Sequence, residues 1–179
     1  MRYFAALALL LASPAGAAVV GSSANGFEVR IVVNLVVSPD VAFAALGDVS
    51  GWWDPEHTYG GDPAMVSLPL RAGGCFCERL PDGGGVEHMH VAYVEPGKRL
   101  VMTGSLGPLL YEATAGVMDV QVKRAAGGSQ LTLDYKVAGF ANGGAEKMAP
   151  LVDDVLSEQV KRYRTYVTAL PRTTGGDQE

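Results

Sequence analysis

The last part of the chain carries one long amphipathic pattern, and this pattern constrains the fold more than any other feature of the sequence. Residues recur there at steps of three and four, as they do on one face of an α-helix. The stripe comprises Met148, Val152, Val155, Gln159, Tyr163 and Tyr166 or Val167. Pro150 is acceptable in the first turn of such a helix, and Pro171 ends it. We therefore expect one long helix near the C-terminus.

The residues before this helix predict strands that are joined mostly as hairpins. A first strand is expected over 27–37. Ser38 and Pro39 then supply a cap and a first-turn residue for a short helix over 40–46, and a second short helix or turn follows over 49–53. Further strands are expected at 65–68, 75–80, 86–94, 99–105, 111–124 and 129–137, with Gly- or Pro-rich turns between them.

This order predicts an α+β fold. A curved antiparallel sheet of about 6–7 strands would wrap around the long C-terminal helix, with two short helices after the first strand. Because a curved sheet and a single helix do not touch along their whole lengths, we expect a cavity between them. The loops around 52–59 and 104–110 would line its mouth.

The first residues are typical of an export signal rather than of the fold. Met1 and Arg2 give a short positive start, 3–12 is apolar, and small residues up to 18 fit a cleavage site. A buried N-terminal helix is the alternative. We divide the chain into a signal peptide at 1–18, a short leader at 19–26, a folded domain at 27–170 and a disordered tail at 171–179. The product is expected to be exported, to the periplasm or the medium.

The composition narrows the range of partners. The formal net charge is −5, whereas nucleic acid and anionic membrane surfaces require clustered Lys and Arg. No apolar run reaches the about 20 residues that a membrane-spanning helix needs, so membrane insertion is not expected. No phosphate-binding glycine loop or dinucleotide fingerprint is present, so no cofactor is predicted.

The residues best suited to chemistry are concentrated between Trp52 and Val91. All three histidines, both cysteines and both tryptophans of the chain fall there. Aromatic, thiol, imidazole and carboxylate groups gathered in one short segment suggest the wall of a pocket.

Four short motifs of this chain resemble one superfamily. They are Ser38-Pro39, Trp52-Trp53, Arg71-Ala72-Gly73-Gly74-x-Phe76 and Val94-Glu95-Pro96-x-x-Arg99-Leu100. Together with the order of elements they resemble the START/Bet v 1-like helix-grip superfamily, and within it the polyketide cyclase/dehydrase and Aha1-C-terminal-domain-like group of SRPBCC proteins. The resemblance covers about 27–170.

The resemblance implies a helix-grip fold with a deep, mainly apolar cavity for small lipophilic molecules. It implies no metal, and it does not imply one activity, because members include binders, transporters, cyclases, dehydratases and a chaperone co-regulator. An export signal departs from the cytosolic role of the chaperone co-regulator.

Our first hypothesis is a binding protein for a small hydrophobic ligand held between the sheet and the C-terminal helix. Pockets of this kind are mostly apolar, with a few polar groups that orient the ligand. The candidate ligand-binding residues are Trp52, Trp53, His57, Tyr59, Phe76, Glu78, His88, His90, Met102 and Tyr135. For the tryptophans, Met102 and Tyr135, a purely structural place in the core is the alternative.

Three other hypotheses use the same residues differently. In the first, Glu78 and His88 act as a general acid/base pair in a cyclisation, dehydration or hydrolysis of the polyketide cyclase/dehydratase type. In the second, Glu78, His88 and His90 bind a metal ion, with His57 or Cys77 as a further ligand. In the third, the domain binds a protein partner and no small ligand. We rank the binder first, keep the enzyme as the alternative and predict no metal.

The hairpin formed by 75–80 and 86–94 decides which of these groups meet. If its turn centres on Gly83, Glu78 faces His88 and Phe76 faces His90 on one side of the sheet. The other side then holds Cys75, Cys77, Met89 and Val91. A register slip of one would exchange the partners, and the sequence leaves open which side faces the cavity.

Cys75 and Cys77 lie two apart on one expected strand, where their Cα atoms would be about 6.5–7 Å apart. That spacing is the outer limit of disulfide geometry, so a disulfide would require a bulge. We expect two buried free thiols instead.

Overall fold

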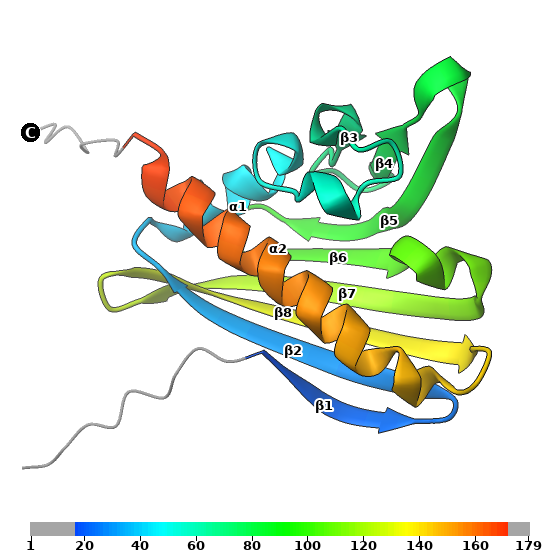
Figure 1. The fold of residues 1–179 in the computed structure, drawn as a ribbon. Coiled ribbons are helices and arrows are strands. Elements are labelled where there is room, and N and C mark those ends of the chain that lie inside the picture. The colour runs from blue at the N-terminus through cyan, green and yellow to red at the C-terminus, as the bar shows by residue number, and fades with distance from the viewer. Residues whose placement is uncertain (1–16, 172–179) are drawn as a thin grey trace, which may run out of the picture.

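A long helix lies diagonally across one face of a twisted antiparallel sheet in the computed structural model, which describes residues 17–171 (Figure 1). The strands are β1 (Ala17–Ser23), β2 (Gly26–Leu35), β3 (Val66–Ser67), β4 (Cys75–Arg79), β5 (Gly85–Glu95), β6 (Arg99–Gly104), β7 (Ala113–Ala125) and β8 (Gly128–Phe140). Their order across the sheet is β1-β2-β8-β7-β6-β5-β4-β3. The α+β helix-grip prediction is therefore confirmed, with eight strands rather than six or seven.

The helices begin and end near the residues that the sequence predicts. They are α1 (Pro39–Leu46) and α2 (Ala149–Ala169), with short 3-10 helices η1 (Val49–Gly51), η2 (Pro55–His57), η3 (Pro63–Met65), η4 (Pro81–Gly83), η5 (Gly107–Tyr111) and η6 (Ala145–Lys147). The Ser38 hydroxyl accepts a hydrogen bond from the amide of Val41 at 3.4 Å and so caps α1. Within 17–171, no helix has the length and hydropathy needed to cross a membrane.

One face of α2 is buried against the sheet and α1. Leu156, Val160 and Val167 lie on this face. Tyr163 is also buried, its hydroxyl donates a hydrogen bond to the Ala42 carbonyl of α1, and burial raises the pKa of its phenol. The contact ties the two α-helices together over the core.

Strand β1 was not predicted. Its residues from Ala18 to Ser23 are exposed, and it is paired to β2 in a register that sets Ala17 against Ile31 and Ser23 against Gly26. The expected leader at 19–26 therefore contributes most of an edge strand, and the expected cleavage site falls at its start. Residues 1–16 of the expected export signal and 172–179 of the expected tail lie outside the described part of the chain.

A β-bulge interrupts the hairpin of β4 and β5, and it changes the predicted register. Phe76 pairs with Met89, but Cys77 pairs with Glu87, so β5 holds one extra residue, His88, at this point. His88 and Met89 are consecutive in the chain, and both point to the buried face. The predicted pairing of Glu78 with His88 and of Phe76 with His90 is wrong. The chain turns one residue earlier than predicted, so Glu78 pairs with Val86, and the bulge then adds one residue before Phe76 pairs with Met89.

Candidate functional site

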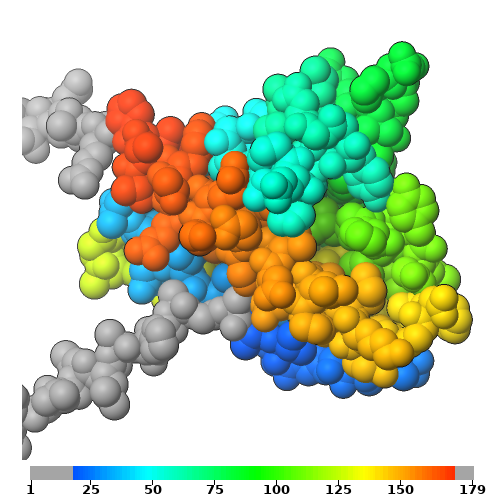
Figure 2. Space-filling view, viewed as in Figure 1, coloured from blue at the N-terminus to red at the C-terminus, as the bar shows by residue number. Residues whose placement is uncertain are grey.

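An open pocket of about 340 Å³ lies where three segments approach α2. The segments are the loop around η2, the middle of β5 and the turn at η5, and Figure 2 shows them meeting α2 around a recess in the surface. The lining residues are Trp53, Glu56, His57, Thr58, Tyr59, His88, Leu106, Gly107, Pro108, Tyr111 and Val155. Both loops expected at the mouth of a cavity, 52–59 and 104–110, contribute to it.

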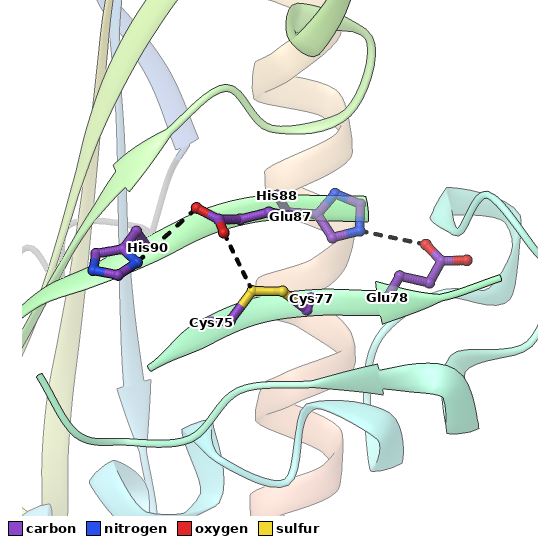
Figure 3. The surroundings of a disulfide bond; sticks show 6 residues. All are labelled: Cys75, Cys77, Glu78, Glu87, His88 and His90. Carbon is purple, nitrogen blue, oxygen red and sulfur yellow. Dashed lines mark hydrogen bonds and ion pairs between the residues drawn. A yellow bond between two sulfur atoms is a disulfide. The ribbon is translucent and has the colours of Figure 1, made fainter. Parts of the chain in front are cut away.

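Glu78 stands behind this pocket as a buried carboxylate with three hydrogen bonds. It accepts one from the Tyr59 amide at 3.0 Å and one from the Gly60 amide at 2.6 Å. The third joins its Oε2 to Nε2 of His88 at 3.3 Å (Figure 3). Glu78 is 1% exposed, so these bonds replace the water that a carboxylate would otherwise require. The carboxylate thereby fixes both the backbone of the η2 loop and the ring of His88.

The ring of His88 presents one nitrogen that is not used by the fold. Because Nε2 faces the Glu78 carboxylate, Nε2 carries the proton, and Nδ1 is left with a lone pair. Nδ1 is buried and has no hydrogen-bond partner among residues 17–171. Desolvation lowers the pKa of His88, and it outweighs the opposing effect of Glu78. The neutral ring is thus a hydrogen-bond acceptor, or a base, in the wall of the pocket.

Tyr59 joins the two loops that form the mouth of the pocket. Its hydroxyl donates to the Gly107 carbonyl at 3.0 Å. Its ring centre lies 5.7 Å from that of His88 and 6.4 Å from that of Tyr111. Burial is the main cause that raises the pKa of Tyr59. The hydroxyl thus remains a neutral donor that holds the η2 loop against η5.

Gln159 of α2 holds the same η2 loop from the opposite side. Its Oε1 accepts from the Asp54 amide at 2.9 Å, and its Nε2 lies 2.8 Å from Nδ1 of His57. The indole of Trp53 donates to the His57 carbonyl at 3.0 Å. In the sequence, Gln159 stands out as a polar residue within the apolar stripe of the helix. That pattern is the signal for a side chain that holds the η2 loop.

The expected hollow between the sheet and the helix is almost filled. The cavity there has a volume of about 50 Å³, whereas an apolar cavity that holds benzene measures about 150 Å³. Large side chains occupy the space. Trp52 packs edge-on against Tyr163 with ring centres 5.3 Å apart, and Trp53 packs edge-on against Phe76 with ring centres 5.1 Å apart. The prediction of a ligand-sized cavity in this position is therefore wrong. The larger space is the neighbouring pocket, and Trp53 lines both.

The ten residues predicted for the site fall into separate places. The pocket of 340 Å³ is lined by Trp53, His57, Tyr59 and His88, and the small cavity by Trp52, Trp53, Phe76 and Met102. Glu78 contacts His88 from behind. Tyr135 lines neither space; its hydroxyl accepts from the Leu106 amide at 3.1 Å, and burial raises its pKa to about 12. Sequence reasoning did not name Tyr111 and Val155 as site residues.

The hypothetical metal site of Glu78, His88 and His90 is not assembled. His88 is buried on the face toward the pocket, whereas the His90 side chain is 51% exposed on the opposite face. The bulge at His88 is the physical reason, because two residues on a regular strand would share a face.

The expectation of two buried free thiols is also wrong. Cys75 and Cys77 form a disulfide with a Cα–Cα distance of 5.2 Å, and both are partly exposed (Figure 3). This Cα separation is shorter than the about 6.5–7 Å expected for a regular strand. The bulge of this hairpin lies in the neighbouring strand β5, opposite the cysteines.

Comparison with known proteins finds similarity in structure alone. No family model matches the chain, and no curated protein matches it. An uncharacterised protein from Rhizobium leguminosarum superposes with a TM-score of 0.60 at 17% identity, covering 80% of this chain and 95% of that one. A protein from Rhodobacter sphaeroides superposes with a TM-score of 0.55 at 19% identity, covering 87% of this chain and 100% of that one.

A third structure, DynU16, is a protein of the dynemicin biosynthetic locus. It gives a TM-score of 0.56 at 21% identity, covering 79% of this chain and 47% of that one. The likeness is one of fold. At these identities the structures share the sheet and the C-terminal helix. They do not show which residues of this chain have a functional role.

Proposed function

We propose that this protein binds a small, mostly apolar molecule that carries one hydrogen-bond donor. The observation that supports the proposal is Nδ1 of His88, a buried acceptor without a partner in a ring that lines the 340 Å³ pocket. A buried polar atom without a partner costs free energy, about 1–3 kcal/mol. A ligand hydroxyl or N–H group that reached this nitrogen would recover that cost.

The walls of the pocket favour an apolar, flat guest. Trp53, Tyr59 and Tyr111 offer aromatic surface, and Leu106 and Val155 add aliphatic surface. A pocket of about 300–1,000 Å³ is the usual size for a small-molecule site. The lower end of that range suits a molecule of one or two rings. A bicyclic phenol has this size and carries the single hydrogen-bond donor that Nδ1 of His88 would accept.

The proposal includes two further parts that rest on the sequence. Export through the signal at 1–18 would place binding in the periplasm or the medium. Membership of the SRPBCC superfamily would relate the pocket to those of lipophile-binding members; the helix-grip fold and the neighbour from a biosynthetic locus support this part.

A matched pair of ligands tests the binding proposal. 2-Naphthol and 2-methoxynaphthalene have nearly the same shape, but only the first donates a hydrogen bond. Equilibrium dialysis is expected to show tighter binding of 2-naphthol by about fivefold, the equivalent of about 1 kcal/mol. In His88→Phe the side chain keeps a ring of similar size and loses the nitrogen acceptor, so the preference should disappear.

The control is His90→Gln, which removes an imidazole from the opposite face. It should leave the preference for 2-naphthol unchanged. If neither compound binds the wild-type protein, or if both bind equally, the proposal is contradicted.

The Glu78–His88 pair also favours a second candidate function, general base catalysis. A carboxylate that orients an imidazole whose far nitrogen is unprotonated is the arrangement of a base that removes a proton from a bound molecule. 2-Tetralone tests this, because it has the size of 2-naphthol and an acidic C–H group. In D₂O, His88 Nδ1 would take that proton to give the enolate, and a deuteron would return to carbon.

Nuclear magnetic resonance would follow the loss of the tetralone proton signal. A catalyst should accelerate this exchange in the wild-type protein and in His90→Gln, and not in His88→Gln. Exchange at the buffer rate in all three proteins would leave binding as the function and exclude this base chemistry.

A further inference from the structure

The outer face of the β4–β5 hairpin carries a second group of reactive side chains, turned away from the pocket. The pairing of β4 with β5 places Cys75 directly opposite His90 and Cys77 directly opposite Glu87. Figure 3 shows the disulfide, Glu87 and His90 together along one side of the hairpin. Four potential metal ligands therefore occupy two adjacent cross-strand pairs, whose Cβ atoms in a regular sheet are about 4.5–5.5 Å apart.

The distances bring these ligand atoms within the reach of one ion. Sγ of Cys75 lies 3.8 Å from Oε2 of Glu87, and Nδ1 of His90 lies 4.0 Å from Oε1 of the same carboxylate. The ligand atoms of Cys75, Cys77 and Glu87 all lie within 4.8 Å of one another. The Glu87 and His90 side chains are 61% and 51% exposed, so both are free to turn toward an ion.

The disulfide itself contributes little to holding the fold. Its cysteines are separated by only two positions in the sequence, and closing so short a loop restricts the unfolded chain little. The β-ladder to β3 and β5 already fixes both residues, through pairs with Ser67, Glu87 and His90. Because both cysteines are also partly exposed, we expect thiol exchange at this bond to leave the hairpin intact.

We propose that reduction of the Cys75–Cys77 disulfide creates a zinc site completed by Glu87 and His90. An external dithiol supplies the two electrons: its thiolate attacks one sulfur, the S–S bond breaks, and its second thiolate releases a cyclic disulfide. Cys75 and Cys77 are left as two thiols. Zn²⁺ then displaces the two thiol protons and binds both thiolates.

The ligand set suits zinc in number and in kind. Zn²⁺ favours tetrahedral sites of sulfur, nitrogen and carboxylate oxygen, and Zn–S bonds of about 2.3 Å place two sulfurs about 3.8 Å apart. The cysteines stand on one face of β4 with Cα atoms 5.2 Å apart, which allows that separation after rotation about the Cα–Cβ bonds. The oxidised protein lacks the two thiolates, so redox state would decide whether the ion binds.

A zinc titration of the full chain in two redox states tests this inference. One sample is reduced with a phosphine, which is then removed without air, and the other is kept oxidised. Competition of Zn²⁺ with a chromophoric chelator should show about one ion per chain in the reduced sample and none in the oxidised sample. Equal binding in both states, or no binding in the reduced state, overturns the proposal.

Two variants identify the remaining ligands. Glu87→Gln and His90→Ala should each weaken zinc binding by the reduced protein on the order of tenfold or more. Glu95→Gln, which changes an exposed carboxylate on the same strand that pairs with Lys98, should leave it unchanged. If Glu87→Gln and His90→Ala bind as the wild type does, the thiols act alone and the four-ligand site is wrong. This test is independent of the pocket, because the site faces the other way.

Discussion

Glu78 Oε2 accepts a hydrogen bond from Nε2 of His88 at 3.3 Å, although the backbone pairs Glu78 with Val86. His88 lies two residues after Val86 and so shares its buried face, and a bulge at this point brings Met89 to that face as well. The same bulge leaves His90 on the outer face with the cysteines. One irregularity in one hairpin thus divides the histidines between two sites.

The Glu78 carboxylate should be a large contributor to stability. Glu78→Gln replaces one acceptor oxygen with an NH₂ group that faces backbone or imidazole N–H donors. We expect the free energy of unfolding to fall by about 2–4 kcal/mol, measured by urea denaturation. The amides of Tyr59 and Gly60 should also exchange faster with D₂O.

Glu158→Gln is the control, because the Glu158 carboxylate is partly exposed and pairs with Lys161 at the surface. It should change stability by less than about 0.5 kcal/mol. Equal midpoints for Glu78→Gln and the wild type would show that the buried network does not hold the η2 loop.

The lowered pKa of His88 predicts a specific dependence of stability on pH. In the unfolded chain His88 takes up a proton near its ordinary pKa of 6.5, whereas in the folded protein it does so only at lower pH. Between the two values the unfolded state binds the proton and the folded state does not. The contribution of His88 is therefore present above pH 6.5 and is lost as the pH falls through the folded pKa.

Urea midpoints measured from about pH 8 to about pH 5 check this sign. The wild type should lose stability faster than His88→Gln as the pH falls, and His90→Gln should follow the wild type. If the His88→Gln and wild-type curves are parallel, His88 is not held neutral by burial.

Trp53 separates the small cavity from the pocket, so its removal should join them. Trp53 is 6% exposed, and Trp53→Ala is expected to cost about 3–5 kcal/mol of stability. The enlarged space should accept 2-anthrol, one ring larger than 2-naphthol. The measured quantity is the ratio of the two dissociation constants, which should shift toward the larger ligand.

Trp52→Ala provides a matched comparison for this experiment. Trp52 is buried too, but it lines the small cavity and not the pocket of 340 Å³. The variant should be destabilised without any change in ligand size preference. A shift of the same size in both variants would mean that Trp53 is not the partition between the two spaces.

Gln159 should be necessary for the position of the η2 loop. Gln159→Leu is nearly equal in volume and leaves the Asp54 amide and Nδ1 of His57 without their partner. We expect a loss of about 1–3 kcal/mol in urea denaturation and a weaker affinity for 2-naphthol. Gln130→Leu removes an exposed amide contact with Asn34 and should affect neither quantity. Unchanged affinity in Gln159→Leu would contradict the positioning role.

Local sequence rules predicted most of the fold, because neighbouring residues determine where these helices and strands begin and which face of them is buried. Ser38 and Pro39 start α1, and the alternation of Leu131, Leu133 and Tyr135 marks the inner face of β8. Strand β1 escaped prediction because it is exposed, and its backbone pairing with β2 holds it without an apolar face.

The site was less predictable, because it depends on tertiary contacts. The sequence from Val86 to Val91 is typical of a regular strand. It does not predict the bulge that places His88 and His90 on opposite faces. The size of the central cavity depends on the packing of Trp52, Trp53 and Tyr163, which no local pattern specifies. The loops at the mouth were predicted correctly, because they follow from the order of elements.

The most direct test of the proposed site is the ¹⁵N resonance of the His88 imidazole. In the ligand-free protein, Nε2 should carry the proton and Nδ1 should have the chemical shift of an unprotonated nitrogen. Saturation with 2-naphthol should move the Nδ1 signal of His88 in the direction of a hydrogen-bonded acceptor, while His90 stays unchanged. A protonated Nδ1 in the free protein, or an Nδ1 signal that 2-naphthol does not move, would contradict His88 as the polar anchor of this pocket.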